Sequence, residues 1–198
     1  NYIVPNIENT TISGLATIAT NYGPKYWWSS YYNWQADYYN IRNSSFVHFR
    51  GQSLNGAVTP NDDCLRTGVM NTTIIDNTLM GCGSGVKFDR TRYSYYHNQA
   101  QWGADGAIVK GNDFIDTEYI DIWFYFSYAD DVVISENSFS GTTSPGYNVY
   151  AQSTYTTDVT ISDNVFRNGV EPIYLRGAQG WEITDNTIYG DGDALSLI

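Results

Sequence analysis

The sequence predicts an all-β protein, a right-handed parallel β-helix of about six to eight coils. Three observations support this prediction. A short apolar phrase recurs along the chain, a second apolar strand follows most copies of it, and no segment sustains the i, i+3, i+4 spacing of an amphipathic helix. A coil of about two dozen residues cannot bury its apolar face alone, so neighbouring coils must supply the core.

The recurring phrase consists of an aliphatic residue, two spacers, an asparagine, one spacer and an apolar residue. It occupies residues 74–79, 109–114, 134–139, 161–166 and 183–188, with a degraded copy at 41–46. Its asparagines are Asn77, Asn112, Asn137, Asn164 and Asn186, at steps of 35, 25, 27 and 22 residues. Asparagine tolerates a left-handed backbone at a tight corner, and stacked copies can bond one another as a ladder. We therefore expect these asparagines to be scaffold.

The second strand begins about 12 residues after the start of the phrase and alternates between inward apolar and outward residues. Its copies are residues 86–88, 120–122, 149–151, 173–175 and 195–197. If the apolar residues point inward, the outward positions are Lys87 and Asp89, Asp121 and Trp123, Tyr150 and Gln152, and Tyr174 and Arg176.

We expect one domain over residues 1–198, because no segment has the composition of a linker. Residues 1–40 are predicted to be irregular and rich in aromatic residues, and residues 41–198 to form regular coils. The chain stops at Ile198 inside an apparent strand, which would expose strand edges. We expect a continuation of the chain, or a partner such as a second copy, to cover that coil.

The composition limits the classes of partner. A formal net charge of −11 disfavours nucleic acid and anionic membranes, and no apolar run is long enough to span a bilayer. The 18 Tyr and 6 Trp suit a surface that stays wet while it contacts a ligand, although such residues also serve in cores. Cys64 and Cys82 fit either an extracellular disulfide or two buried thiols.

The phrase resembles the repeats of carbohydrate-active β-helix proteins such as pectate lyases, polygalacturonases and phage tailspikes. A sharper local likeness to polygalacturonases lies in Asn61-Asp62-Asp63-Cys64 followed by Gly81-Cys82-Gly83. The resemblance implies that Asp62 and Asp63 act as an acid–base pair and that Cys64 and Cys82 form a disulfide. The family's Gly-His-Gly and Arg-x-Lys have no counterpart here, and Asp62 and Asp63 also suit a turn that caps backbone amides.

The outward positions suggest a groove for an extended glycan, in which Trp123, Tyr150 and Tyr174 contact sugars while charged groups bond hydroxyls. Lys87, Asp89, Asp121 and Arg176 complete the predicted substrate-binding set. A solvated strand face with incidental aromatic residues explains the same pattern. We predict no resident cofactor, with Ca²⁺ as the one metal that the acidic segments could take.

These inferences give two hypotheses from different classes. In the first, the chain is an extracellular or cell- or virion-surface protein that binds a polysaccharide and, if it is an enzyme, is a hydrolase or lyase. In the second, it is a structural or adhesive subunit that uses the β-helix as a rigid rod. An open groove would support the first hypothesis, and a face covered by neighbouring subunits would support the second.

Overall fold

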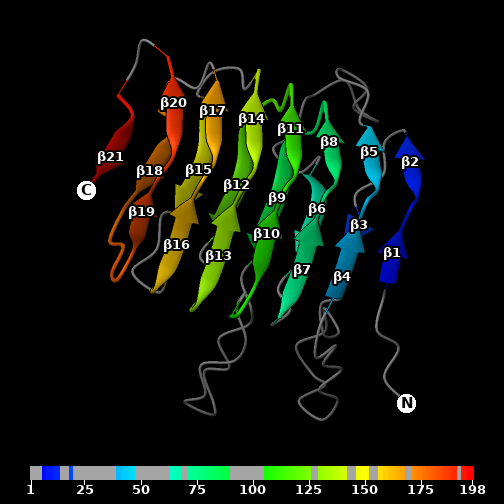
Figure 1. Ribbon diagram of the computed structural model, residues 1–198, viewed down its shortest axis with the longest axis horizontal. Coiled ribbons are helices and arrows are strands. Elements are labelled where there is room, and N and C mark those ends of the chain that lie inside the picture. Colours follow the sequence, from blue (N-terminus) through cyan, green and yellow to red (C-terminus); the bar gives the residue numbers. More distant parts are fainter. Residues whose placement is uncertain are drawn as a thin grey trace, which may run out of the picture.

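The computed structural model describes residues 6–13, 18–19, 39–47, 63–67, 71–89, 105–125, 129–141, 146–151, 156–167, 171–190 and 193–198. These residues form three parallel sheets of seven strands each, and the described part of the chain contains no helix. Consecutive strands of the chain fall in different sheets, and each strand pairs with the equivalent strand of the next coil (Figure 1). The predicted parallel β-helix is confirmed, with seven coils.

The three sheets are named A, B and C in the order in which each coil enters them. Sheet A contains β1 (Asn6–Glu8), β4 (Tyr39–Arg42), β7 (Thr72–Ile75), β10 (Ile108–Lys110), β13 (Val132–Ser135), β16 (Val159–Ser162) and β19 (Glu182–Thr184). Sheet B contains β2 (Thr11–Ser13), β5 (Ser45–Val47), β8 (Thr78–Met80), β11 (Asp113–Ile115), β14 (Ser138–Ser140), β17 (Val165–Arg167) and β20 (Thr187–Tyr189). Sheet C contains β3 (Ile18–Ala19), β6 (Asp63–Thr67), β9 (Ser84–Asp89), β12 (Ile120–Tyr125), β15 (Tyr147–Ala151), β18 (Ile173–Leu175) and β21 (Leu195–Leu197).

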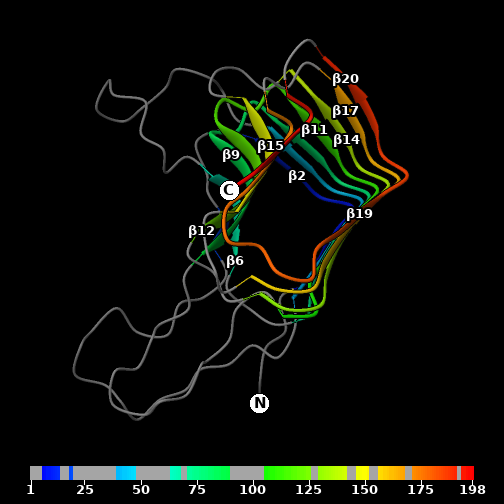
Figure 2. The same ribbon diagram turned by 90° about the vertical axis from the view of Figure 1, so that its left-hand side faces the viewer.

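The core fills the space that the three sheets enclose (Figure 2). Equivalent positions stack along the coil axis, because the strands pair in register from one coil to the next. In sheet A the stacked aliphatic residues are Ile41, Ile74, Val109, Ile134 and Ile161, all at most 1% exposed. In sheet B the stacked residues are Phe114, Phe139 and Phe166, with ring centroids 4.9 and 4.8 Å apart. The apolar position of each recurring phrase therefore becomes one layer of a continuous core.

The recurring asparagines form a buried ladder at the corner between sheets A and B. In Asn77, Asn112, Asn137 and Asn164, the backbone N–H and the side-chain amide both donate to the Oδ1 atom of the asparagine one coil on, at 2.9–3.0 Å. The side-chain amide of each of the five recurring asparagines also donates to a backbone carbonyl in the preceding coil, at 2.7–3.0 Å. Ser44 continues the ladder in the degraded copy, where its N–H donates to Asn77. The predicted ladder is confirmed.

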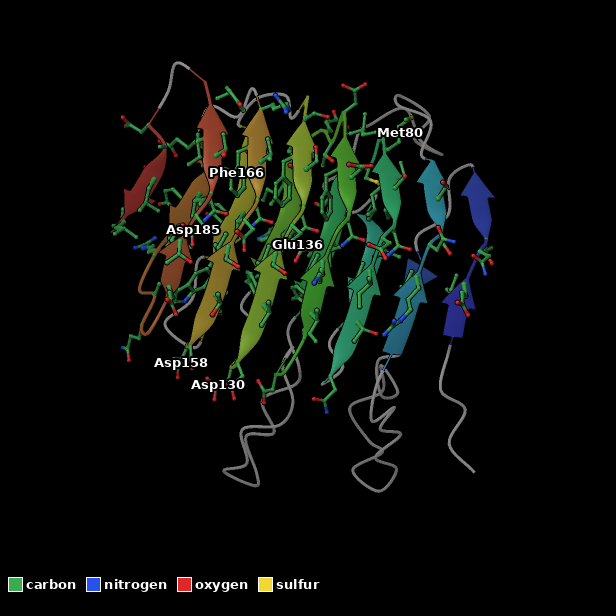
Figure 3. The ribbon with its side chains drawn as sticks, viewed as in Figure 1. Met80, Asp130, Glu136, Asp158, Phe166 and Asp185 are labelled. Carbon is green, nitrogen blue, oxygen red and sulfur yellow. A yellow bond between two sulfur atoms is a disulfide. The ribbon has the colours of Figure 1, made fainter. Side chains whose placement is uncertain are left out.

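The left-handed residue of this corner is the one before each ladder asparagine, so the predicted left-handed asparagine is wrong. Asp76, Glu136, Asp163 and Asp185 have φ between 54° and 56°, and Gly111 takes the same place with φ 65°. Glu136 and Asp185 mark the corner in Figure 3. The ladder asparagine keeps an ordinary backbone, which aims its side chain inward at the neighbouring coils. The exposed residue before it absorbs the strained φ.

The coils also begin earlier than the sequence predicts. β1, β2 and β3 lie in the segment expected to be irregular, and they pair with β4, β5 and β6 in parallel register. Ile7 aligns with Ile41, so the first coil carries the repeat with Thr10 in the asparagine position. The substitution of the one conspicuous residue concealed this copy of the phrase.

Cys64 of β6 and Cys82, which precedes β9, form a disulfide, as predicted. Both residues are at most 1% exposed. Because β6 and β9 are neighbours in sheet C, the bond joins two successive coils at the edge of that sheet.

Replacing Asn137 by leucine should destabilise the fold by about 3 kcal/mol, because it leaves donors of Asn112 and the Val109 carbonyl without their partner. Equilibrium unfolding in urea measures this loss. Asn186→Leu is the matched control, since Asn186 holds the same place in the phrase but is only partly buried, so its loss should be smaller. Equal losses of stability at the two positions would contradict the view that burial makes the hydrogen bonds of the ladder stabilising.

Candidate functional site

The candidate site lies on the outward surface of sheet C. Lys87 of β9, Trp123 of β12, Tyr150 of β15 and Tyr174 of β18 align in one register across successive coils. Their strand neighbours Val86, Phe88, Ile122, Phe124 and Val149 are fully buried in the core, so the aligned residues point outward. The predicted column of Trp123, Tyr150 and Tyr174 is confirmed as a structural feature, with about 4.8 Å between strands.

The tyrosine rings of this surface pack on one another. Tyr150 and Tyr174 are stacked, with ring centroids 4.9 Å apart and planes 9° from parallel. Tyr147 leans against both rings, at 4.9 Å from Tyr150 and 5.3 Å from Tyr174. The facing sides of Tyr150 and Tyr174 are thus occupied, and the pair presents ring edges and hydroxyl groups outward. We use the name aromatic face for Trp123, Tyr147, Tyr150, Tyr174 and Arg176.

The stack ends at the last coil, where Ser196 of β21 lies opposite Tyr174. Among the described residues, the ring of Tyr174 contacts two others. Tyr150 stacks on it, and Tyr147 is tilted at 59° to it. A serine is too small to cover a phenol ring. Within the described part of the chain, no other ring therefore covers the side of Tyr174 that faces Ser196, and a sugar ring could lie against it.

Lys87 lies in the outward column but is only 3% exposed. Its Nζ atom lies 4.1 Å from the centre of the Trp123 ring, within the range of a cation–π interaction. One side of the indole ring is therefore in contact with the ammonium group of Lys87. Lys87 supports the position of Trp123, and its charge is not displayed on the surface as the sequence suggested.

The predicted outward position of Asp121 is wrong, because this side chain is 0% exposed. Asn148 donates its side-chain amide to Asp121 Oδ2 at 2.6 Å. Asp121 lies beside Gly85 in the register, and a Cβ atom at Gly85 would lie 2.6 Å from the core ring of Phe114. Position 85 therefore faces the interior, and its neighbours Asp121 and Asn148 are buried at the same bend of sheet C.

This error has a definite cause in the register. The predicted repeat places Ile120 opposite Val86, whereas the structure pairs Ile120 with Ser84 and Ile122 with Val86. The two-residue offset moves Trp123, and not Asp121, opposite Lys87. The bend at Gly85 then interrupts the strict alternation of inward and outward side chains, which a period of two cannot reveal. Tyr147 was missed for the same reason, since strict alternation from Val149 would turn it inward.

The remaining predicted residues are placed as follows. Arg176 follows β18 and is exposed beside the tyrosines. Asp63 begins β6 and Asp89 ends β9, both in sheet C, and their side chains lie outside the described part of the structure. Asp62 lies outside the described residues. Asp63 pairs with Ser84, Ser84 with Ile120, and Ile120 with Tyr147. Asp63 and Tyr147 therefore hold equivalent positions, each at the start of its strand, with β9 and β12 between them.

The surroundings of Tyr147 and Tyr150 favour the protonated form of their hydroxyl groups. Burial raises the pKa of Tyr147, and the nearby carboxylate of Glu171, to which the hydroxyl is hydrogen-bonded, raises it further. Burial also raises the pKa of Tyr150, followed by its neighbours Tyr174 and Tyr147, while the Arg176 guanidinium acts in the opposite direction. Protonated phenols can both donate and accept hydrogen bonds, which is the chemistry that a hydroxyl-rich ligand requires.

The fold and this surface define the class of the protein as a right-handed parallel β-helix. Residues 55–197, more than two thirds of the chain, match the family described as periplasmic copper-binding protein (NosD). The chain therefore belongs to that family, and the narrower likeness to pectate lyases and polygalacturonases is not confirmed. No curated protein and no solved structure matches the chain.

The family corrects one prediction and bears on two others. Its description as copper-binding overturns the expectation of no resident cofactor with Ca²⁺ as the one metal. Its description as periplasmic is compatible with the predicted extracellular or surface location in the coarser sense of a place in or outside the cell envelope, and it does not single out the surface. Within the described residues, no helix has the length and apolar character needed to traverse a bilayer.

Raising the pH should destabilise the protein above about pH 10, the ordinary pKa of tyrosine. A raised folded-state pKa means that the folded chain favours the protonated phenol, so its contribution is complete below pH 10 and disappears as the pH passes the raised value. Thermal unfolding of the protein and of Tyr150→Phe between pH 8 and 11 checks this sign. The variant should lose less stability over that range. An equal or larger loss would contradict the assignment.

Proposed function

We propose that this protein binds an extended polysaccharide outside the cytoplasm, and that the aromatic face is its binding surface. The observation that carries the proposal is the outward alignment of Trp123, Tyr150 and Tyr174 on three successive coils. Tyr147 and the exposed Arg176 extend this surface to either side of the tyrosine stack. Aromatic bodies with polar tips suit a ligand that has both apolar faces and hydroxyl groups.

The repeat of the coils matches the repeat of a polymer. A polysaccharide that runs along the coil axis meets a similar group at each coil, about 4.8 Å further on. The hydroxyl groups of the tyrosines can exchange hydrogen bonds with sugar hydroxyls, and the free side of the Tyr174 ring above Ser196 can contact a sugar ring. The rings hold one another in place by stacking, so little conformational freedom is lost on binding.

Copper, the ligand in the family's description, does not fit the described residues. Copper prefers imidazole, thiolate and thioether ligands. Cys64 and Cys82 are joined to each other, and Met80 of β8 in sheet B is the thioether among the described residues. His48, His97 and Met70 lie outside the described residues. Among the described side chains no group of three or more His, Cys, Asp or Glu could hold a metal ion. The binding that we propose for the aromatic face therefore does not involve copper.

Trp123→Ala combined with Tyr174→Ala should abolish retention of the protein in gels that contain its polysaccharide ligand, because both changes remove the outward aromatic bodies. Affinity electrophoresis against a panel of polysaccharides measures the retention. Tyr189→Ala is the matched control, since Tyr189 is a 52% exposed tyrosine on β20 in sheet B, away from the aromatic face. This control should retain full binding.

Circular dichroism must show that the double variant keeps its strands, because Trp123 also packs with Lys87. Undiminished retention of a folded double variant would refute the aromatic face as the binding surface. If the unaltered protein binds no polysaccharide, the rigid-rod hypothesis takes the place of this proposal.

We further propose that Asp62 and Asp63 cleave the bound chain as an acid–base pair. The supporting observation is that Asp63 starts its strand of sheet C in the same register as Tyr147, one of the tyrosines of the aromatic face. Two adjacent carboxyl groups repel each other, which favours one protonated acid and one ionised base.

Replacing both residues, Asp62→Asn and Asp63→Asn, should abolish the release of new reducing ends while retention in affinity gels is unchanged. Amide groups keep the size of the carboxyls and can still form hydrogen bonds, but they cannot act as proton donor or base. Continued release by the double variant would contradict the assignment of these two residues.

A further inference from the structure

The charges of the aromatic face indicate which class of polysaccharide it accepts, and this inference rests on the proposed binding function. Four charged residues were predicted to line the face, the cations Lys87 and Arg176 and the carboxylates Asp89 and Asp121. The structure removes one of these cations from the surface. Lys87 is 3% exposed and its ammonium group sits against the indole of Trp123.

The carboxylates follow the same trend. Asp121 is 0% exposed and accepts a hydrogen bond from Asn148. Glu171 is half-buried, and the Tyr147 hydroxyl is hydrogen-bonded to it. Among the described side chains of sheet C and its flanking turns, Arg176 is the exposed cation next to the tyrosines. The aromatic face therefore carries the Arg176 guanidinium, and the carboxylate of Glu171 beside it has the opposite charge and is engaged by the Tyr147 hydroxyl.

The rest of the chain makes this balance decisive. The formal net charge is −11, so a polymer of uronic acids or sulfated sugars would approach a protein of its own sign. Among the described side chains next to the tyrosines, only the Arg176 guanidinium is an exposed cation that would attract it. A neutral polymer meets no such repulsion. The groups that the face does offer are phenol hydroxyls, ring edges and one free ring side, all of which match sugar hydroxyls and C–H groups.

We infer that the ligand of the aromatic face is a neutral, hydroxyl-rich polysaccharide rather than an acidic one. Arg176 then serves as a hydrogen-bond donor to hydroxyl groups and not as a counter-ion. Binding to a neutral polymer involves no net charge pairing, so salt should change it little. Binding of an acidic polymer through Arg176 would weaken steeply as salt screens the pair.

The test measures retention of the intact protein by neutral polysaccharides (a glucan, a xylan and a mannan) and by acidic ones (polygalacturonate and alginate), at low and at high salt. We expect binding to at least one neutral polymer, with an affinity that changes less than about threefold between the two salts. Acidic polymers should bind at least about tenfold more weakly at low salt.

The variant Arg176→Gln sharpens the comparison, because glutamine keeps hydrogen-bonding groups but removes the charge. It should lower the affinity for the neutral polymer by less than about tenfold, with no change in its salt dependence. Preferential, salt-sensitive binding of an acidic polymer that Arg176→Gln abolishes would overturn this inference and leave the proposed binding function standing. Failure to bind any polymer would overturn both.

Discussion

The registry between coils is the constraint on which the rest of this structure depends. The side-chain amide of a ladder asparagine such as Asn77 donates to both neighbouring coils, and the Oδ1 atom of Asn112 accepts hydrogen bonds from the coil before it. A coil shifted by one residue would leave all of these buried groups unsatisfied, at about 1–3 kcal/mol for each. The ladder therefore fixes which residues stack. It aligns the phenylalanines inside sheet B and, further along the same coils, it aligns the tyrosines outside sheet C.

The fold could be predicted because the ladder leaves a direct mark in the sequence. The same phrase recurs five times with an asparagine at its centre, and the inward apolar residues keep their spacing from that asparagine. The first coil shows the limit of that signal. Thr10 replaces the asparagine there, and although Ile7 still aligns with Ile41, the coil could not be recognised from spacing alone. The strands of this coil still pair in register with threonine in that position, but the phrase no longer contains the asparagine that identifies it in the sequence.

The site was less predictable, because it depends on events between the repeats. The steps between coils vary, and the turn that leads into β12 shifts the alignment of Ile120 by two residues. The bend at Gly85 then turns Asp121 and Asn148 into the core and leaves Tyr147 free to join the other tyrosines. Neither the turn nor the bend has a residue signature that a period of two detects. Trp123, Tyr150 and Tyr174 were found because they lie beyond the bend, where alternation resumes.

The same stacking that aligns the aromatic face also limits what it can do. A ring that packs on the ring of the next coil gains rigidity but gives up the flat side with which it could contact a sugar. Tyr150 and Tyr174 each give one flat side to the other, and the second side of Tyr174 faces Ser196, which is too small to cover it. Specific contacts should therefore concentrate at the Tyr174 end of the column, next to Arg176. The buried Lys87–Trp123 pair at the other end contributes shape and stiffness.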